Sequence, residues 1–381
     1  MLQLIRVQPG DKQNIKAFIQ FPFDLYKNSP YWVPPIHGEV ESILDGNQHP
    51  FYKHSKAAFF IICEGRQVLG RIAILKNQLY NEYHKSQVAF FYFFDCVENL
   101  QVSKQLLDAA VEWASDQGAT EIYGPRGFSR SSCAGLLVEG FDHLPAMGIS
   151  YNYPYYDRLL SEYGFTKVTD YYSGYADKDI QFSNRVEMVV EKVKKRGNFE
   201  IINFTSKKDM KKWVPILDPV HHEAFKNNPG YYPSTPEEFE ALAKNLIAIA
   251  EPKLVKLIKK QDEIVGFILA YPNISRALQK CKGKLFPFGW YYLLREKRTS
   301  KMGDINSVGL LPSAQGVGAN YFLYDELART LRDYGFDRVE FIQIDERNYR
   351  SKCDMENLGV TWYKRHRTYR LQINKGGVDA Q

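Results

Sequence analysis

The chain has 381 residues, of which 44% are hydrophobic, so it can bury a substantial core, and two domains are the default expectation. Its net charge of +6 is mild and its Lys and Arg residues are interleaved with acids, which argues against a nucleic-acid partner. No apolar run approaches the length of a membrane span and the five cysteines lack zinc-ligand spacing, so we expect a cytoplasmic protein with reduced thiols, no membrane partner and no metal.

The N-terminal half alternates strands and helices. Apolar residues recur with the helical period from Val102 to Gln117, and Gly118 then ends the predicted helix. The expected elements, in chain order, are a strand at Leu2–Val7, a helix at Asp11–Tyr26, a hairpin of Ala57–Cys63 and Gln67–Leu75, a strand at Val88–Val97, the helix at Val102–Gln117, a strand at Thr120–Tyr123, a helix at Tyr155–Tyr163 and a closing hairpin within Phe165–Tyr175.

The C-terminal half repeats this order. Thr235 followed by Glu238 is a capping-box pattern and opens one of its helices. The expected elements are a strand at Phe199–Phe204, helices at Lys207–Phe225 and Pro236–Ala250, a hairpin of Leu254–Lys259 and Ile264–Ala270, a strand at Asp304–Leu311, a helix at Gly318–Tyr334, a strand at Arg338–Ile344, a helix at Tyr349–Leu358 and final strands within Thr361–Ile373.

The repeated order predicts two copies of one mixed α/β unit. We place a first domain at 1–178, a linker helix at 179–198 and a second domain at 199–381. The linker helix is indicated by Val186, Val189, Val190 and Val193, which share one helical face.

The stretch with a chemical signature runs from Asp304 to Asn320, where a buried strand ends and a short loop feeds an amphipathic helix. Gly316 and Gly318 lie at the start of that helix. A helix N-terminus carries unpaired N–H groups and partial positive charge, and glycines let a pyrophosphate approach the backbone. The spacing fits neither a Walker A loop nor a dinucleotide fingerprint. A plain strand–helix turn remains the alternative.

The segment Gln315-Gly-Val-Gly-Ala-Asn320 resembles the pyrophosphate motif of the GNAT (Gcn5-related N-acetyltransferase) superfamily, Arg/Gln-x-x-Gly-x-Gly/Ala. Downstream, Asn348 with Ser351 and then Leu358-Gly359 resembles another segment of that family. The whole chain also resembles a group of tandem-GNAT bacterial proteins, whose signatures are similar to Trp32-Val-Pro-Pro35, Gly70-Arg-Ile-Ala73, Gly124-Pro-Arg-Gly-Phe-Ser129, Glu139-Gly-Phe-Asp142 and Tyr151-Asn152-x-Pro154-Tyr155-Tyr156. The resemblance implies an α/β (α+β) fold of two tandem GNAT-like domains, each with a mixed, mostly antiparallel sheet flanked by helices.

The resemblance also implies a binding site for acetyl-CoA or another acyl-CoA. Backbone around Gly309, Leu310 and Leu311 would pair with pantetheine and offer an N–H to the thioester oxygen, and Asn348 would hydrogen-bond the pantetheine arm. Asn348 has a second interpretation, as the cap of the helix that follows it. The residues whose backbone would bind the pyrophosphate are Gln315, Gly316, Val317, Gly318, Ala319 and Asn320.

Two positions depart from the family pattern. Asn320 stands where the loop motif has Gly or Ala, and Met355 stands where many GNATs have the tyrosine that protonates the leaving thiolate. Tyr363 and Tyr349 are weak substitutes. No glutamate matches the family's general base, although Asn306 and Asp304 lie near its position.

His222 and Glu223 are further weak candidates for the base, because their helix borders the acceptor cleft in GNATs. The neighbouring His221 does not turn this pair into a metal site, since adjacent helical residues point to different faces. The N-terminal copy has no glycine between Glu98 and Leu106, so we expect that domain not to bind CoA.

The sequence therefore predicts an acyl-CoA-dependent N-acyltransferase, with acetyl transfer as the first expectation, acting on a small-molecule amine by direct attack in a ternary complex. One rival is a non-catalytic acyl-CoA-binding or scaffold protein. The other is an aminoacyl-tRNA-dependent transferase built from paired GNAT-like domains. The acceptor, the acyl length, the acid and base, and the oligomeric state stay open.

Overall fold

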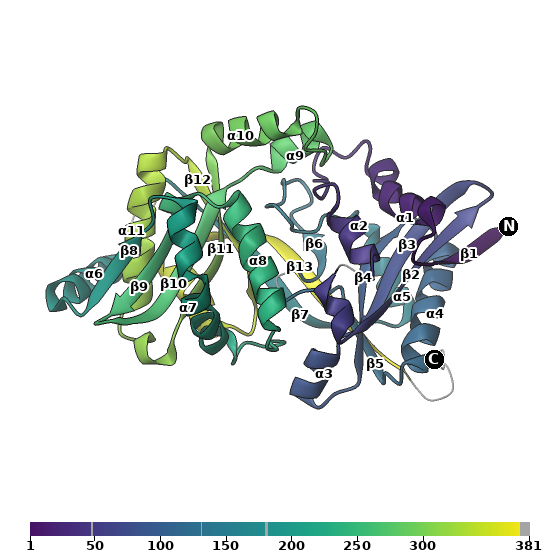
Figure 1. Ribbon diagram of the computed structural model, residues 1–381, viewed down its shortest axis with the longest axis horizontal. Coiled ribbons are helices and arrows are strands. Elements are labelled where there is room, and N and C mark those ends of the chain that lie inside the picture. Colours follow the sequence, from purple (N-terminus) through teal and green to yellow (C-terminus); the bar gives the residue numbers. More distant parts are fainter. Residues whose placement is uncertain (47–48, 131, 180–181, 374–381) are drawn as a thin grey trace. The chain divides into compact units, whose positions relative to one another are not determined.

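The computed structural model describes residues 1–46, 49–130, 132–179 and 182–373 (Figure 1). The chain forms two compact units, and each is discontinuous in sequence. The first contains Met1–Tyr171, Ser275–Tyr292 and the described residues from Lys364 onward, and the second contains Tyr172–Ile274 and Leu293–Tyr363. Strands β7 and β13 therefore each begin in one unit and end in the other.

The sheet of the first unit has the order β1-β2-β3-β4-β5-β13, with β6 and the first part of β7 beside β13. The pair β4–β5 is parallel, whereas β1–β2, β2–β3, β3–β4, β5–β13 and β6–β13 are antiparallel. Its strands are β1 (Leu2–Val7), β2 (Lys56–Glu64), β3 (Gln67–Lys76), β4 (Val88–Cys96), β5 (Glu121–Gly124), β6 (Leu136–Glu139), and parts of β7 (Thr166–Asp177) and β13 (Thr361–Gln372). Its helices are α1 (Lys12–Leu25), α2 (Glu39–Leu44), α3 (Gln78–His84), α4 (Leu100–Asp116), α5 (Tyr155–Tyr163) and α9 (Ser275–Cys281).

Alternation along β2 explains the layers of this unit. Phe60 and Ile62 belong to a core shared with α4, whereas Phe59 and Ile61 on the same strand belong to a core shared with α1 and α2. Successive strand residues face opposite sides of a sheet, so an uninterrupted apolar run serves both cores. The sheet is covered by helices on both faces.

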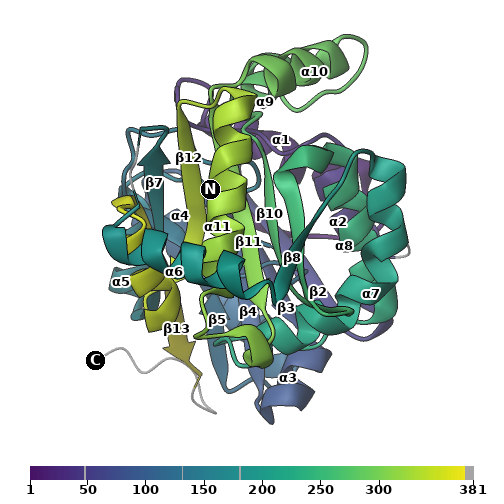
Figure 2. The same cartoon turned by 90° about the vertical axis from the view of Figure 1, so that its left-hand side faces the viewer.

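The second unit repeats the plan with the order β7-β12-β11-β10-β9-β8. Figure 2 shows α7 and α8 on one side of this sheet and α11 with α6 on the other, and two separate apolar cores lie beneath them. The strands are β8 (Phe199–Asn203), β9 (Val255–Lys260), β10 (Glu263–Pro272), β11 (Met302–Leu310) and β12 (Arg338–Asp345). The helices are α6 (Asn184–Arg196), α7 (Lys207–Phe225), α8 (Pro236–Ile249), α11 (Ala319–Tyr334) and α12 (Tyr349–Asn357), and α10 (Gly289–Thr299) begins in the first unit and ends here.

The prediction of two copies of one mixed α/β unit is confirmed, and so is the capping box at Thr235 and Glu238. Two expectations were wrong. The segment Phe165–Tyr175 forms no hairpin, because β7 runs through it as one strand, and Thr361–Ile373 likewise holds the single strand β13. The helices α9 and α10 were not predicted at all.

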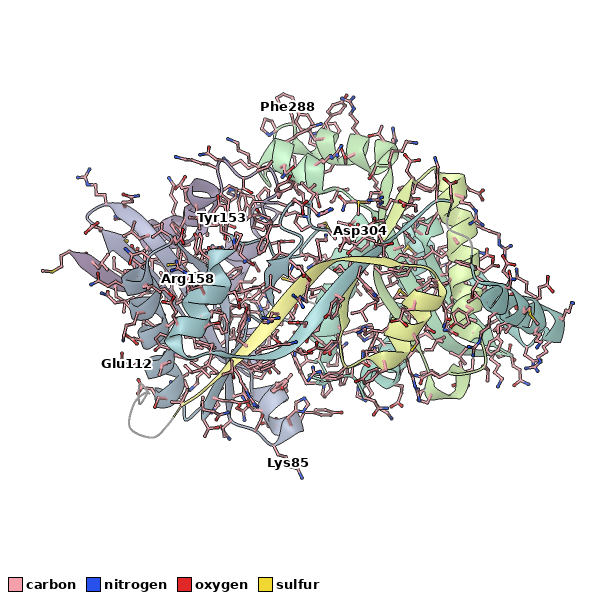
Figure 3. The ribbon with its side chains drawn as sticks, turned by 180° about the vertical axis from the view of Figure 1, so that it is seen from behind. Lys85, Glu112, Tyr153, Arg158, Phe288 and Asp304 are labelled. Carbon is pink, nitrogen blue, oxygen red and sulfur yellow. The ribbon has the colours of Figure 1, made fainter. Side chains whose placement is uncertain are left out.

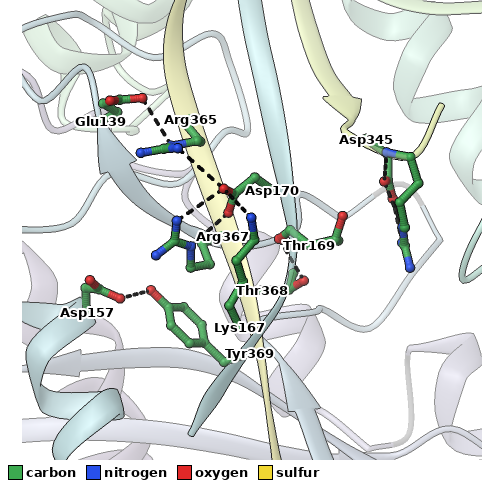
Figure 4. Close-up of polar contacts among 11 residues, drawn as sticks. Glu139, Asp157, Lys167, Thr169, Asp170, Asp345, Arg365, Arg367, Thr368 and Tyr369 are labelled. Atoms are coloured by element: carbon green, nitrogen blue, oxygen red, sulfur yellow. Dashed lines mark hydrogen bonds and ion pairs between the residues drawn. The ribbon is translucent and has the colours of Figure 1, made fainter. Parts of the chain in front are cut away.

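A buried ionic cluster joins β7 to β13 within the first unit (Figure 4). The Asp170 carboxylate is fully buried and accepts two hydrogen bonds from the Arg367 guanidinium, at 2.8 and 3.1 Å, with Lys167 Nζ at 2.9 Å. Burial raises the pKa of Asp170, but the hydrogen bonds from Arg367 and Lys167 hold it below its usual value. A carboxylate matched in this way stabilises the strand pair.

His366 is a second buried polar group on β13. Its Nε2 lies 3.1 Å from the backbone oxygen of Ser150, and the ring is fully shielded from solvent. Burial lowers the pKa of His366 to about 4, so the ring is neutral in the folded protein at neutral pH.

Among the described residues, no helix has both the length and the apolar character needed to cross a membrane. The same residues contain no cluster of His, Cys, Asp and Glu arranged to hold a metal.

Candidate functional site

The central strands of the second unit pair over only part of their length. β11 and β12 are parallel neighbours from Met302–Arg338 to Ile305–Phe341, and over the described residues of both strands the pairing goes no further. The remaining edge of β11, from Asn306 to Leu310, therefore has no partner strand among the described residues, and this unpaired stretch of edge is here called the gap. Such an edge presents backbone N–H and C=O groups to whatever enters the gap.

A β-bulge lies where the two strands part. Along β10 the register jumps so that Leu269 pairs with Ser307 and Ala270 with Ile305, which leaves Asn306 as the extra residue. Bulges bend a strand and re-aim its side chains. Asn306 is exposed, and its side chain hydrogen-bonds the Tyr271 hydroxyl on β10.

The direction of the N–H groups on β11 follows from one hydrogen bond. Leu311 N–H donates to the Val265 carbonyl at 2.8 Å, on the β10 side. Because backbone groups alternate along a strand, the N–H groups of Leu310 and Val308 point to the opposite edge, into the gap. Of the three residues expected to offer an N–H to a thioester oxygen, Leu310 therefore directs its N–H to the unpaired edge, whereas the Leu311 N–H is already bonded to β10.

The loop after β11 leads into the N-terminus of α11. Gly318 is the N-cap, with φ of 89°, and among the described residues no side chain caps this helix. Its first N–H groups lack intrahelical partners by construction, and the dipole adds partial positive charge. Gly316 has φ of 73°, is exposed, and has open space where a Cβ would lie. This loop is shaped to accept an anion.

Gly318 faces the other way. A Cβ there would lie 2.5 Å from Val189 Cγ1 and 3.0 Å from Val193 Cγ2, both on α6. The predicted linker helix is thus a packing element of the second unit, and its valine face covers the start of α11. Gly316 and the exposed Val317 present the open face of the loop, while Gly318 allows close helix packing.

Gln315 and Asn320 hold the loop by side-chain contacts. Gln315 Nε2 donates to the Leu310 carbonyl at 3.0 Å, and its Oε1 accepts from the Arg350 guanidinium on α12. Asn320 Nδ2 donates to Asp354 at 2.9 Å, so its side chain turns toward α12 and leaves the loop uncrowded. Arg350 was not singled out from the sequence, and it places a positive charge beside the loop.

Two proteins are similar to this chain over most of its length. No protein-family profile matches the sequence. Protein YghO of Escherichia coli K12 is 28% identical over 370 residues, covering 95% of this chain and 94% of that protein. A protein of Caulobacter vibrioides named bacterial ceramide synthase is 27% identical over 365 residues, covering 93% and 94%.

Solved structures decide the fold. A tandem GNAT protein from the clavulanic acid biosynthesis pathway superposes with a TM-score of 0.57 at 10% identity, covering 99% of this chain and all of that one. This chain has the tandem GNAT fold. A GCN5-related N-acetyltransferase from Sphaerobacter thermophilus superposes with a TM-score of 0.51 at 15% identity, covering 100% and 98%.

In this GNAT fold two positions considered for the acid, Met355 in place of the family's tyrosine and its weak substitute Tyr363, are largely shielded from solvent. Met355 is almost fully buried in the apolar core of the second unit. Tyr363 is mostly buried, and burial together with the neighbouring Glu340 carboxylate raises its pKa well above the usual value for a phenol. A phenol of raised pKa is a weak proton donor toward a thiolate.

A polar cluster on three strands was only partly foreseen (Figure 3, in which Asp304 is labelled). Asp304 and Glu340 are both fully buried and are register partners on β11 and β12, and Tyr271 on β10 lies opposite Asp304. Asp304 accepts two hydrogen bonds from Asn273 Nδ2, at 3.0 and 3.1 Å. The signal available in the sequence was a pair of acids inside strands that are otherwise apolar.

Helix α7 borders the same sheet, and its two histidines face different ways, as the sequence predicted. His221 stacks on Phe267, the β10 residue opposite Gly309. His222 points to a neighbouring face of the helix, where its Nδ1 lies 2.6 Å from the Tyr231 hydroxyl. Glu223 forms an ion pair with Lys226 at 2.6 Å, and this hydrogen bond lowers the pKa of Glu223. A carboxylate stabilised in its charged form is a weaker base, so His222 is the better candidate of the pair.

Asn348 caps α12, with its side-chain oxygen accepting from the Ser351 N–H at 3.2 Å. The second interpretation of Asn348 is therefore confirmed, and only its amide NH₂ remains for a ligand.

The corresponding places in the first unit are closed. Asn99 caps α4 by accepting from the N–H groups of Gln101 and Val102 at 2.9 and 3.2 Å. Beyond the last β4–β5 pair, Phe90 with Tyr123, the Arg126 N–H donates to the Phe91 carbonyl at 2.9 Å. In the first unit the helix start is thus capped by a side chain and the strand edge is contacted at Phe91, which differs from the uncapped start of α11 in the second unit.

Proposed function

We propose that the second unit binds an acyl-CoA and transfers the acyl group to an amine, in a protein that works in the cytoplasm. The observation that carries this proposal is the uncapped start of α11 at Gly316–Gly318 next to the open edge of β11. The first would hold the pyrophosphate and the second the pantetheine amides. The capped helix at Asn99 supports assigning the cofactor to the second unit alone.

The chemistry proposed is direct attack of the amine on the thioester. The Leu310 N–H, directed into the gap, would donate to the oxyanion of the tetrahedral intermediate, and removing such a donor typically costs about 3 kcal/mol in the transition state. His222 would take the proton of the attacking amine. The thiolate, of pKa about 8.5, would leave without a protein acid.

The relative named bacterial ceramide synthase favours a long-chain version of this chemistry. A ceramide is an amide between a fatty acyl group and a long-chain amino alcohol, so the proposed donor is a fatty acyl-CoA and the proposed acceptor a long-chain primary amine.

The test is release of free CoA by the full-length protein. Acetyl-CoA and palmitoyl-CoA are each paired with short and long-chain amines, and free thiol is followed with a colorimetric reagent. We expect turnover with palmitoyl-CoA and a long-chain amine. Turnover with acetyl-CoA alone would return the proposal to acetyl transfer, and CoA binding without release for any pair would favour a binding protein.

A comparison of two variants tests the base. His222→Gln should lower kcat by about 10²–10⁴-fold with little change in CoA affinity, while Glu223→Gln should change it far less. Equal effects would refute the assignment to His222.

A further inference from the structure

The connection between β10 and β11 holds an exposed aromatic surface. Phe286 and Phe288 are 82% and 70% exposed, and the first half of α10 adds three more exposed rings and one exposed leucine. Phe288 is labelled in Figure 3, where its side chain points outward from the ribbon. The other exposed apolar residues are Trp290, Tyr291, Tyr292 and Leu294. Six exposed apolar side chains within nine residues of sequence indicate an interaction site.

The same connection has a large net positive charge. Between Ser275 and Lys301 the sequence has eight Lys and Arg residues and a single acid, Glu296, which gives a net charge of +7. The whole chain has +6, so all the other residues together come to −1. The exposed cations flanking the aromatic surface are Lys280, Lys282, Lys284, Arg295 and Arg298.

Hydrogen bonds to other segments hold the connection near both of its ends. Gln279 Nε2 donates to the carbonyls of Pro30 and Trp32, at 2.8 and 3.0 Å, and the Gly283 carbonyl accepts from the His37 N–H at 2.8 Å. Farther along, Lys297 Nζ donates to the Ala250 carbonyl at 2.8 Å. The exposed rings between these ties therefore belong to a structured surface rather than to a frayed end.

We propose that residues 280–298, here named the docking segment, bind the surface of a membrane that contains anionic lipids. Aromatic rings with an apolar body suit the boundary between headgroups and acyl chains, and flanking Lys and Arg residues are attracted to anionic headgroups. This inference concerns docking in the plane of the interface, which needs no spanning helix. It departs from the expectation of no membrane partner, and it does not depend on the chemistry proposed above.

The charge distribution selects this occupant over two others. A second copy of the chain would bring its own docking segment, with a net charge of +5, against the first, and like charges placed together oppose association. A nucleic-acid duplex would satisfy the cations, yet its bases are already stacked and leave the Phe286-Pro-Phe288 tip without an apolar partner; single-stranded bases that stack on the rings are an outcome of the competition test below. An anionic bilayer satisfies both the rings and the charges.

The experiment is flotation of the full-length protein with vesicles. One set contains equal parts of phosphatidylglycerol and phosphatidylcholine, and the other contains phosphatidylcholine alone. We expect binding to the anionic vesicles, weaker binding to the neutral ones, and a decrease with rising salt. Two variants remove the two components, Phe286→Ser/Phe288→Ser/Trp290→Ser and Lys282→Gln/Lys284→Gln/Arg295→Gln/Arg298→Gln. Each should lower the partition constant by roughly 10²-fold or more.

Matched controls change similar residues elsewhere. Tyr83→Ser/Met188→Ser alters exposed apolar side chains, and Lys192→Gln/Lys195→Gln/Arg196→Gln neutralises the basic end of α6. Both controls should float like the wild type, and all variants should keep the wild-type melting temperature.

Several outcomes would overturn the proposal. Failure of the wild type to float with anionic vesicles would do so, as would loss of flotation in the controls. Sedimentation showing a dimer that the aromatic variant abolishes, without vesicle binding, would assign the surface to a second copy. Tight binding of a single-stranded oligonucleotide that outcompetes the vesicles would assign it to nucleic acid.

Discussion

A charge placed on the open loop tests the pyrophosphate site directly. Val317 is 45% exposed and lies between the two glycines of the loop. Val317→Glu adds a carboxylate beside the proposed pyrophosphate, and Val317→Gln adds an amide of nearly the same shape. The difference in CoA affinity between the two variants therefore isolates the charge.

The magnitude follows from Coulomb's law. At about 7 Å and an effective dielectric constant of about 20, two unit charges repel by about 2 kcal/mol, and physiological salt roughly halves this. A pyrophosphate with roughly two negative charges then loses about 2 kcal/mol of binding free energy, which is roughly 30-fold in Kd. At about 1 M salt the difference should shrink to a few-fold.

Isothermal titration calorimetry with free CoA measures the three Kd values for the wild type, Val317→Gln and Val317→Glu. Melting temperatures without CoA should agree, because the site is exposed. Equal Kd values for the two variants would place the pyrophosphate elsewhere, and no wild-type binding at about millimolar CoA would remove the cofactor proposal altogether.

Three further predictions concern stability and chemistry. Gly316→Ala and Gly318→Ala both place alanine at positive φ, but only the Cβ of the second would contact α6. In urea unfolding, Gly318→Ala should therefore lose about 1–3 kcal/mol more of the free energy of unfolding than Gly316→Ala. Equal losses would contradict the packing of α6 on the loop. His366 has a pKa of about 4 when folded and about 6.5 when unfolded, so between these values the unfolded chain binds one proton more than the folded chain. The free energy of unfolding therefore decreases as the pH is lowered from about 6.5 to about 4. The free energy of unfolding should drop by about 2 kcal/mol from about pH 7 to about pH 5, and His366→Gln should lack that component. Tyr363→Phe should lower kcat by less than about tenfold, whereas a loss of two or three orders of magnitude would identify Tyr363 as the acid.

The repeated unit was predictable because its signals are local. Helix periodicity, the Thr235–Glu238 capping box and Gly335 after α11 each act within a few residues, and each appears where the sequence places it. The loop from Gln315 to Asn320 was found for the same reason, since glycines at a helix start constrain the backbone locally.

What the sequence did not show depends on contacts between distant residues. The orientation of Gly318 toward Val189 follows from the packing of α6, and the loss of Leu311 as a donor follows from its pairing with Val265. The helix α10 escaped notice because its exposed aromatic face lacks the alternation of apolar and polar residues that burial imposes. The packing of Gly318 and the hydrogen bond of Leu311 can be recognised only when the helix packing and the strand register are known.

The exchange of strand segments between the two units makes them difficult to separate. A chain that ended at Tyr363 would lack residues Tyr369–Gln372 of β13, which pair with β5. The sheet of the first unit would then have an unpaired edge at β5, and unpaired strand edges promote aggregation. A chain begun at Phe199 would lack both β7 and the α6 valines that cover the start of α11. A nonsense mutation late in the gene should therefore damage the N-terminal unit first. Because each unit needs strand segments that continue into the other, the first unit is required for the fold even though Asn99 caps its own helix start at α4.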